Sequence, residues 1–488
     1  MYYGISSIAA KFINYLLTPY LTYNALFSVS DNGKMSAVYS LIPMLNILFT
    51  YGMESAYFRF VNKSASPEET TNTTQITLLF TTVVFSVGMW VATPWLATVA
   101  SLQAVPALIS LSIVIIATDT LCAIPFARLR NEGRPLLFAF IRVSSILINI
   151  GAVLFFLSLC PPLVTKNPQG WASYFYNPAT NPVVYILLAN IVQNIVTLLL
   201  LQKWFWPTRW QINTSLLKNM LWYALPMLVA GLGGMVNETF DRLMLGWWLP
   251  STVDHDVERG IYGACYKISL FVTLFIQAFR MGAEPFFFKQ AKQANAPETY
   301  AKVTYYFVLL MALIFIAVVA NMPILQYFVA PKYWRGLPIV PILLLANICL
   351  GIYYNLSVWY KVTQHVLYGT YITFIGCGIT LLVNYIGIPI FGFMACAVAT
   401  LSCYSIMMFL SYIWGQKKYP IPYATKTLGA YLLASIVLVA LLYTVQQRAT
   451  VWVQLIAGWA VLFAFTGFLL WKERAEMKKL PLIGKFLG

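Results

Sequence analysis

Charged side chains are scarce in this chain: they make up 9% of its 488 residues, whereas a typical soluble domain carries about 25%. So few charges cannot cover the surface of a water-soluble body of this size. Histidine is nearly absent, with two residues, and the seven cysteines form no CxxC pair and have no histidine at ligand spacing. These shortages argue against a disulfide framework and a zinc-type site, and we predict no metal and no cofactor.

The chain also lacks a GxxxxGK nucleotide-binding motif and any segment long enough for a soluble domain. The longest connection expected outside the membrane, residues 161–181, contains no carboxylate. Membrane-embedded glycosyltransferases and polymerases generally need a sizeable loop that carries catalytic groups. We therefore predict that the protein is not an enzyme, and that any transport it performs draws on an ion gradient, the membrane potential or product removal.

Long apolar stretches occupy most of the chain. They recur at close to ~20 residues, the length of a helix that crosses a bilayer, and lack the short alternating pattern of a membrane barrel. We predict an all-α integral membrane protein with about 14 transmembrane helices. The expected spans are 5–26, 36–58, 74–97, 104–127, 136–160, 182–202, 219–248, 261–285, 302–326, 338–360, 367–389, 392–414, 427–446 and 452–471.

Basic residues are distributed unevenly between the two ends of these spans. The segments after even-numbered spans hold 20 of the 31 Lys and Arg residues, and those after odd-numbered spans hold 6. Basic loops stay in the cytoplasm. We therefore predict that both termini are cytoplasmic, that 161–181 and 249–260 are external, and that the net charge of +16 reflects topology rather than nucleic-acid binding.

Two similar strings lie 230 residues apart and share five identical positions: "GMESAYFRFVNKSASPE" at 52–68 and "GAEPFFFKQAKQANAPE" at 282–298. A second echo aligns "ILINIGAVLFF" with "LLVNYIGIPIF" and places Asn149 opposite Asn384. Six spans, an even number, separate the copies, so they share one orientation, as in transporters built from parallel repeats. We predict two pseudo-symmetric six-helix lobes plus two C-terminal helices: an N-lobe at 1–203, a C-lobe at 204–426, and two further spans with a basic cytoplasmic tail at 427–488.

Five cations lie inside expected spans, where an isolated charge costs at least ~2.5 kcal/mol. Cations in a central aqueous cavity can hold a phosphate or diphosphate. The alternative is that they pair with acids and fix helix packing or, for Lys11, that the side chain snorkels to the surface. The candidate diphosphate ligands are Lys11, Arg142, Arg242, Lys267 and Arg280.

Five acids are candidates for ion coupling or gating: Asp119, Glu238, Asp241, Glu54 and Glu284. Glu238 and Arg242 are four residues apart and can pair along one helix. Glu54 with Arg59, and Glu284 with Lys289, recur by duplication and indicate either latches between helix ends and neighbouring loops or a gate. Asp119 suits a proton or sodium site, or a hydrogen-bonded helix contact.

Several strings resemble bacterial polysaccharide-biosynthesis proteins, which are oligosaccharide-lipid flippases of the multidrug/oligosaccharidyl-lipid/polysaccharide exporter superfamily. They are "INYLLTPYLT", "YGMESAYFRF", "RLRNEGRPLLFAFIRVSSILINI", "LPMLVAGLGGMVNETFDRLMLG" and "GIYGACYKISLFVTLFIQAFRMGAEPFFFKQAK". The resemblance implies a protein of the bacterial inner membrane that exports undecaprenyl-diphosphate-linked oligosaccharide for O-antigen, capsule or exopolysaccharide. It also implies contact with membrane lipids and with a polysaccharide polymerase.

Two related functions stay open at this point. A multidrug or cation antiporter of the same superfamily is expected to have an acid-dominated cavity, whereas here the five cations within spans outnumber the three deep acids. A peptidoglycan-precursor flippase handles a carrier of the same chemistry, so cavity charge does not separate it from an oligosaccharide-lipid flippase.

Overall fold

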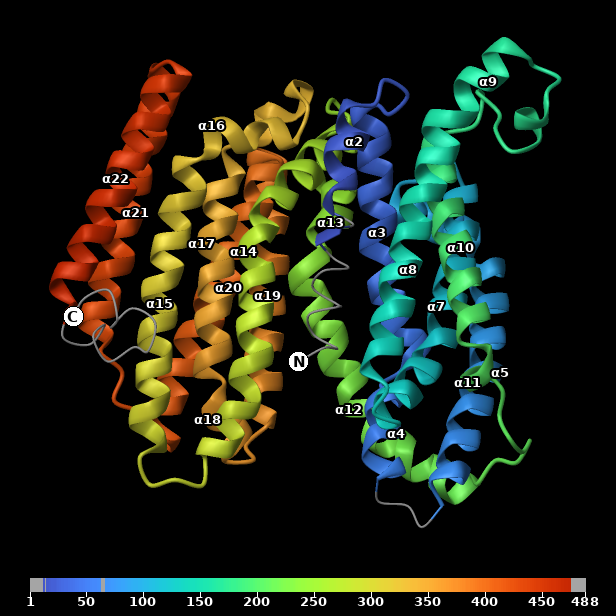
Figure 1. Ribbon diagram of the computed structural model, residues 1–488, viewed down its shortest axis with the longest axis horizontal. Helices are drawn as coiled ribbons and strands as arrows, with labels where there is room; N and C mark the ends of the chain where they lie inside the picture. The colour runs from blue at the N-terminus through green and yellow to red at the C-terminus, as the bar shows by residue number, and fades with distance from the viewer. Residues whose placement is uncertain (1–11, 14, 63–65, 475–488) are drawn as a thin grey trace.

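The computed structural model describes residues 12–13, 15–62 and 66–474, and the regular structure of these residues is entirely helical (Figure 1). Thirteen helices within the described part of the chain are long and apolar enough to cross a membrane. The predicted all-helical membrane fold is confirmed, while the count of about 14 is not. Residues 5–11 and 14 of the first expected span, 5–26, lie outside the described residues, and the rest of it contains α2 (Leu17–Tyr23).

The N-lobe consists of α3 to α10, which follow one another through short connections. Its helices are α3 (Val29–Thr50), α4 (Met53–Val61), α5 (Pro67–Val91), α6 (Thr93–Ala100), α7 (Ala107–Asn131), α8 (Pro135–Leu154), α9 (Cys160–Lys166) and α10 (Pro182–Leu200). A capping box starts α3, since Ser28 and Asp31 satisfy each other's backbone N–H groups. Tyr51 and Gly52 separate α3 from α4 with φ of 32° and 76°.

The short α11 (Gln202–Phe205) leads into the C-lobe, and two further helices complete the chain. The C-lobe helices are α12 (Thr214–Thr239), α13 (Asp241–Trp248), α14 (His255–Gln290), α15 (Ala296–Ala320), α16 (Met322–Leu325), α17 (Ile339–Leu356), α18 (Val358–Val362), α19 (Leu367–Phe391) and α20 (Phe393–Lys418). The last two, α21 (Thr425–Arg448) and α22 (Val451–Lys472), pack against α15.

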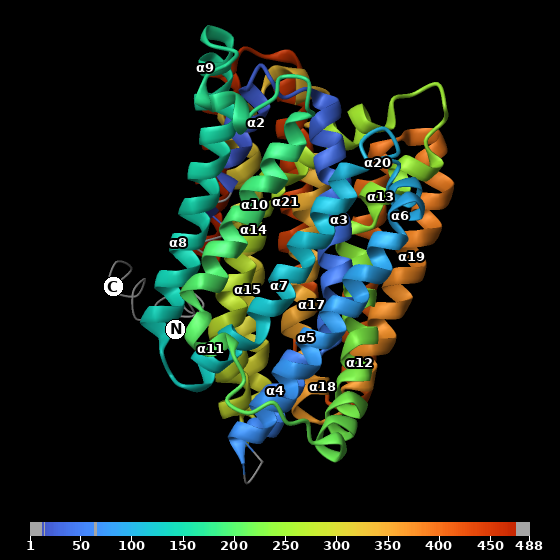
Figure 2. The same cartoon turned by 90° about the vertical axis from the view of Figure 1, so that its right-hand side faces the viewer.

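Equivalent helices pack in the same way in both lobes. In the N-lobe α7 and α8 both contact α10, and in the C-lobe α17 and α19 both contact α20. Each lobe has its own large apolar core, and Figure 2 shows the tilted bundle from the N-lobe side. Large apolar side chains such as Phe140 on α8 and Phe463 on α22 remain exposed, as expected for helices that face lipid.

Three expected boundaries are wrong in detail. The span at 219–248 is two helices, because the chain breaks at Phe240 between α12 and α13. The span at 136–160 continues through a π-helical turn, Phe155–Leu159, into α9. The connection expected at 249–260 is partly helical, since Asp254 accepts bonds from the backbone N–H groups of Asp256 and Val257 and so starts α14 at His255.

The two lobes meet most closely where α3 crosses α14. A Cβ atom on Gly33 would lie 1.7 Å from the backbone oxygen of Asp256, and one on Gly260 would lie 2.1 Å from that of Val29. The backbones can therefore approach this closely only because these residues are glycines. The crossing lies at the end of the molecule away from α4 and α18 (Figure 1), and we call it the closed end.

Candidate functional site

A buried ion pair lies at the junction of α12 and α13. The Nη1 atom of Arg242 is 2.9 Å from Oδ1 of Asp241, and it also donates to the backbone oxygen of Glu238 at 2.8 Å. The guanidinium lies over the ring of Tyr266 on α14, 4.2 Å from its centroid. The Tyr262 hydroxyl donates to the other oxygen of Asp241. The pair is therefore neutralised and hydrogen-bonded within the protein.

This geometry corrects the expected ion pair between Glu238 and Arg242. Arg242 uses only the backbone oxygen of Glu238, and its carboxylate partner is Asp241. The helical register expected from the spacing fails because the helix breaks at Phe240. Asp241 also accepts a bond at 2.8 Å from the backbone N–H of Arg242, a local contact that competes with helix continuation.

Two charged groups near this pair are left without an ion-pair partner among the described residues. Glu238 is exposed, and it lies within electrostatic range of the hydroxyls of Tyr266, Tyr354 and Tyr404. Lys267 is half-buried, and Arg242 is the charged group that acts on it. We call Glu238, the Asp241–Arg242 pair and Lys267 the central cluster.

Lys267 lies on the side of α14 that faces the N-terminal segment. Phe271, four residues further on and so on the same face, has its ring centroid 6.5 Å from that of Phe12. Lys267 thus shares a face of α14 with a residue that contacts Phe12. Lys11, another candidate diphosphate ligand, lies outside the described residues.

The repeated glutamates form equivalent latches at the end of the molecule where α4 and α18 lie. Glu54 pairs with Arg130 at the end of α7, and Glu284 pairs with Lys361 of α18 at 2.7 Å. The two glutamates are 230 residues apart and their partners 231 apart. Arg59 and Lys289, which accompany these glutamates in the repeat, form no ion pair with them within 4 Å. Glu284 also binds Arg280 at 2.9 Å, so this candidate ligand is held in a shared pair.

A cavity of about 720 Å³ lies in the N-lobe, bordered by α3, α7, α8 and α10 and by Met235 of α12. We call it the N-lobe cavity. Asp119 of α7 and Arg142 of α8 both line it, yet no ion pair within 4 Å joins either of them to a described residue. Arg142 lies over the ring of Phe126 at 4.0 Å. The fold therefore brings an acid and a base of the candidate set to one cavity.

At the corresponding place in the C-lobe, the cavity is only about 10 Å³. Four of its lining residues stand at repeat positions of residues that line the N-lobe cavity. The N-lobe set is Asn46, Thr50, Glu54 and Ala123, and the C-lobe set is Ile276, Arg280, Glu284 and Tyr354.

Arg259 fastens the two lobes together at the closed end, and the sequence-based reading missed it. Its side chain is fully buried, donates to the backbone oxygens of Arg242 at 2.8 Å and Ala100 at 3.2 Å, and pairs with Asp256 at 3.2 Å. Ala100 belongs to the N-lobe. Asp254 could have revealed Arg259, because a helix-capping residue inside the expected loop predicts a helix that starts there and includes this arginine.

A second contact supports the same end. Lys332 donates to the backbone oxygen of Phe27 at 2.9 Å, and burial lowers the pKa of its ammonium. Asn32 of α3 donates to the backbone oxygen of Gly260 at 3.3 Å. The closed end is therefore held by hydrogen bonds from both lobes.

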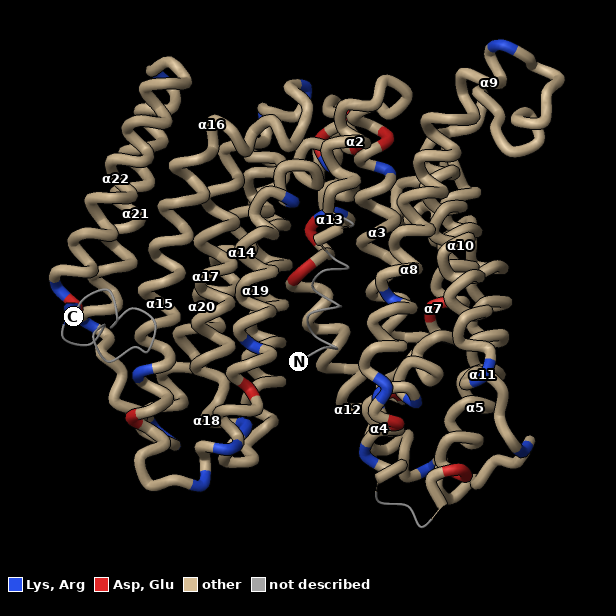
Figure 3. The backbone as a smooth tube through the Cα atoms, viewed as in Figure 1, with Lys and Arg blue, Asp and Glu red and all other residues tan. Residues whose placement is uncertain are grey.

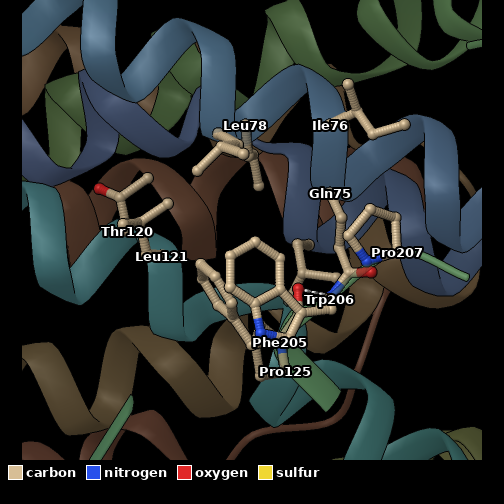
Figure 4. Close-up of a pocket in the computed structure, with 11 residues that line it drawn as sticks. Gln75, Ile76, Leu78, Thr120, Leu121, Pro125, Phe205, Trp206 and Pro207 are labelled. Carbon is tan, nitrogen blue, oxygen red and sulfur yellow. Dashed lines mark hydrogen bonds between the residues drawn. The ribbon is translucent and has the colours of Figure 1, made fainter. Parts of the chain in front are cut away.

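The connection between the lobes is anchored to the N-lobe beside a small pocket of about 20 Å³ (Figure 4). Gln75 donates to the backbone oxygens of Trp204 at 2.6 Å and Phe205 at 2.9 Å, and Arg128 donates to Trp204 at 2.8 Å. Trp206 and Pro207 also line this pocket. It has no titratable lining group.

No group of three or more His, Cys, Asp or Glu side chains in the described part of the chain could hold a metal ion. The seven cysteines are buried and unpaired.

The chain and its fold are similar to several known proteins. Residues 1–291 match a family described as "Polysaccharide biosynthesis protein". A search of curated proteins finds no match. Among solved structures, the lipid II flippase MurJ in an inward closed conformation is 12% identical, with a TM-score of 0.72 over 96% of this chain and 99% of that one.

Multidrug resistance transporters of the MATE family, in the MOP superfamily, are also similar. An inward-facing structure has a TM-score of 0.61 at 14% identity, covering 86% of this chain and 95% of that one. An outward-facing structure has a TM-score of 0.52 at 13% identity, covering 88% and 94%. At these identities the likeness establishes the fold only.

Proposed function

Because the chain belongs to the polysaccharide biosynthesis protein family, we propose that it translocates polyprenyl-diphosphate-linked oligosaccharide across the bacterial cytoplasmic membrane by alternating access. The substrate is an undecaprenyl-diphosphate-linked glycan for O-antigen, capsule or exopolysaccharide. Its headgroup is too polar to cross hydrocarbon unaided. The protein supplies a polar path between the lobes while the polyprenyl tail stays in lipid.

The observation that carries this proposal is the unpaired ammonium of Lys267. A lysine within a membrane-spanning helix is costly, and no carboxylate of the described residues lies within 4 Å of this one to compensate. Arg242 lies nearby, but its charge is already balanced by Asp241. A diphosphate that enters between the lobes offsets the cost at Lys267 through charge-assisted hydrogen bonds.

The distribution of basic residues supports an orientation for the path. Lys and Arg residues gather at the end where α4 and α18 lie (Figure 3), and such an end is typically cytoplasmic. The α3–α14 crossing lies at the other end. With that orientation the structure is closed to the outside, and the substrate enters from the cytoplasm, where lipid-linked glycans are made.

The cycle then requires the lobes to part at the closed end. Arg259 and Lys332 release their backbone partners on the other lobe, and α3 separates from α14. The latches at Glu54 and Glu284 join helices within one lobe, so they can persist as each lobe moves as a body. The acids Asp119, Glu238 and Asp241 are the candidates for coupling this motion to an ion gradient.

Transport in proteoliposomes tests the role of Lys267. We expect Lys267→Gln to slow translocation of the lipid-linked glycan about tenfold or more, because it removes a charge-assisted contact. Lys267→Arg should retain most of the activity. Lys426→Gln, at an exposed position on α21, is the matched control and should change nothing. Equal rates for Lys267→Gln and the unaltered protein would contradict the proposal.

The two alternatives have their own readouts. Growth of producing cells in toxic cationic dyes identifies a multidrug or cation antiporter. Complementation of a strain that has lost its peptidoglycan-precursor flippase identifies that function. Accumulation of lipid-linked glycan inside cells that lack this protein, with neither of those effects, supports the oligosaccharide-lipid flippase.

A further inference from the structure

The walls of the N-lobe cavity are rich in side-chain amides. Asn46 comes from α3, and Asn190, Gln193 and Asn194 come from successive turns of α10. The hydroxyls of Ser145 and Thr197 also line it. An amide presents two N–H donors and a carbonyl acceptor, so it can bond to a hydroxyl in either direction. The volume of about 720 Å³ falls within the usual range of small-molecule sites, about 300–1,000 Å³.

Several of these side chains form hydrogen bonds with other residues of the N-lobe. Asn194 donates to Thr118 at 3.0 Å and to the backbone oxygen of Ile115 at 3.3 Å, while Asn190 donates to the backbone oxygen of Ile186 at 2.9 Å. No described group donates to the amide oxygens of Asn190 and Gln193. The walls are therefore partly preorganised and retain amide oxygens that accept no hydrogen bond from a described group.

The charges on the walls are balanced, unlike those expected for an anion site. Glu54 is paired with Arg130, and Asp119 and Arg142 carry opposite charges. A diphosphate needs a net positive surrounding, which this cavity does not provide. Neutral, hydroxyl-rich groups are the better match, since they bond to amides, to a carboxylate and to a guanidinium in one place.

The cavity also lies next to the central cluster. Met235 of α12 forms part of its wall, and Glu238 follows three residues later, about 4.5 Å further along the helix axis. A molecule that places an anionic group near Lys267 can therefore extend a neighbouring polar group into the N-lobe.

We propose that the N-lobe cavity is a carbohydrate subsite, which holds the first sugars of the lipid-linked glycan while Lys267 binds the diphosphate. This assignment rests on the proposed function. It divides recognition between the lobes: the C-lobe binds the part common to all such carriers, and the N-lobe binds the part that differs between glycans.

Binding measurements with two lipids test this division. The first probe is bare undecaprenyl diphosphate, and the second is the undecaprenyl-linked glycan extracted from cells that lack the protein. Both are titrated into the full-length protein in nanodiscs. The variants are Asn46→Ala and Gln193→Ala, whose amides make only 3.4 Å contacts with Thr120 and Asn194 and so contribute little to folding. Lys267→Gln is the comparison.

We expect the unaltered protein to bind the glycosylated lipid more tightly than the bare lipid. Each cavity variant should weaken binding of the glycosylated lipid about threefold to tenfold, the effect of one lost hydrogen bond, and leave the bare lipid unchanged. Lys267→Gln should weaken both. The unchanged affinity for bare lipid also shows that the variants are folded.

The possible failures are distinct. If the unaltered protein binds both lipids equally, or if the cavity variants weaken both or neither, the carbohydrate subsite is wrong while the proposed function stands. If the unaltered protein binds neither lipid, the proposed function fails and the subsite fails with it.

Discussion

The two lobes share the ion pairs that join their helix ends and differ in the size of the cavity that lies behind those pairs. The ion pair of Glu54 with Arg130 and that of Glu284 with Lys361 stand at equivalent positions of the two repeats. Behind the first latch lies a cavity of about 720 Å³, and behind the second one of about 10 Å³. Larger C-lobe side chains contribute to this difference at two repeat positions, where Tyr354 corresponds to Ala123 and Arg280 corresponds to Thr50.

The same two positions also affect the chemistry of each interior. Tyr354 fills the C-lobe space and receives the guanidinium of Arg280 over its ring, 4.5 Å from the centroid. In the N-lobe, Thr50 stands where the C-lobe has Arg280, and the space stays open and uncharged at that point. The duplicated halves have thus kept the contacts that hold helix ends together and diverged where a ligand can enter.

The largest effect is expected from giving the N-lobe the C-lobe's side chain. Ala123→Tyr places a ring in the N-lobe cavity, where open volume can accept it without the cost of overpacking. We expect the protein to fold and to lose nearly all transport of the lipid-linked glycan in proteoliposomes. Ala123→Ser, which leaves the cavity open, is the control. Normal transport by Ala123→Tyr would show that the difference between the lobes has no role in function.

A second test compares equivalent glycines at the α3–α14 crossing. A Cβ atom on Gly33 would lie 1.7 Å from a backbone oxygen, whereas one on Gly263 would lie 2.3 Å from the Oγ atom of Ser36, a side chain that can rotate away. Gly33→Ala should therefore open the closed end far more than Gly263→Ala. Overpacking of this kind costs about 1–3 kcal/mol.

The readout is the labelling of a cysteine introduced at Val29 by a maleimide that does not cross membranes. The seven native cysteines are buried, so background labelling is low. We expect Gly33→Ala to raise the labelling rate roughly tenfold, equivalent to about 1.4 kcal/mol, and Gly263→Ala to raise it less. Equal effects of the two variants would contradict the asymmetry of the crossing.

Hydropathy and the internal repeat predicted the fold because each of them can be recognised within short stretches of the sequence. Thirteen of the expected spans correspond to helices, and the repeat led directly to Glu54 and Glu284. The partners of these glutamates were missed, since Arg130 and Lys361 lie 76 and 77 residues away in the sequence. Nothing in the spacing of a single string indicates which distant helix end packs beside it.

Local geometry also changed the role of matched residues. Gly52 adopts a positive φ and ends α3, whereas Gly282, its repeat counterpart, lies inside the continuous α14. Asp119 and Arg142 were both singled out by their cost within the membrane, but only the packing of α7 and α8 shows that they share a cavity. The helix break at Phe240 likewise gave Arg242 a different partner from the one that helical spacing predicted.

The smallest effect concerns the latches themselves. Glu284 receives both Lys361 and Arg280, whereas Glu54 receives Arg130, so Glu284→Gln should lower thermal stability more than Glu54→Gln. All of these side chains are about one-quarter to two-fifths exposed, so solvent screening limits each pair to about 1 kcal/mol or less. Thermal unfolding at low and high salt measures the difference, which should shrink as salt rises because screening weakens both latches. The reversed pair, Glu54→Arg with Arg130→Glu, should recover the stability lost in Glu54→Arg. A failure of that rescue would mean that Glu54 acts through some contact other than the ion pair that its repeat copy shares.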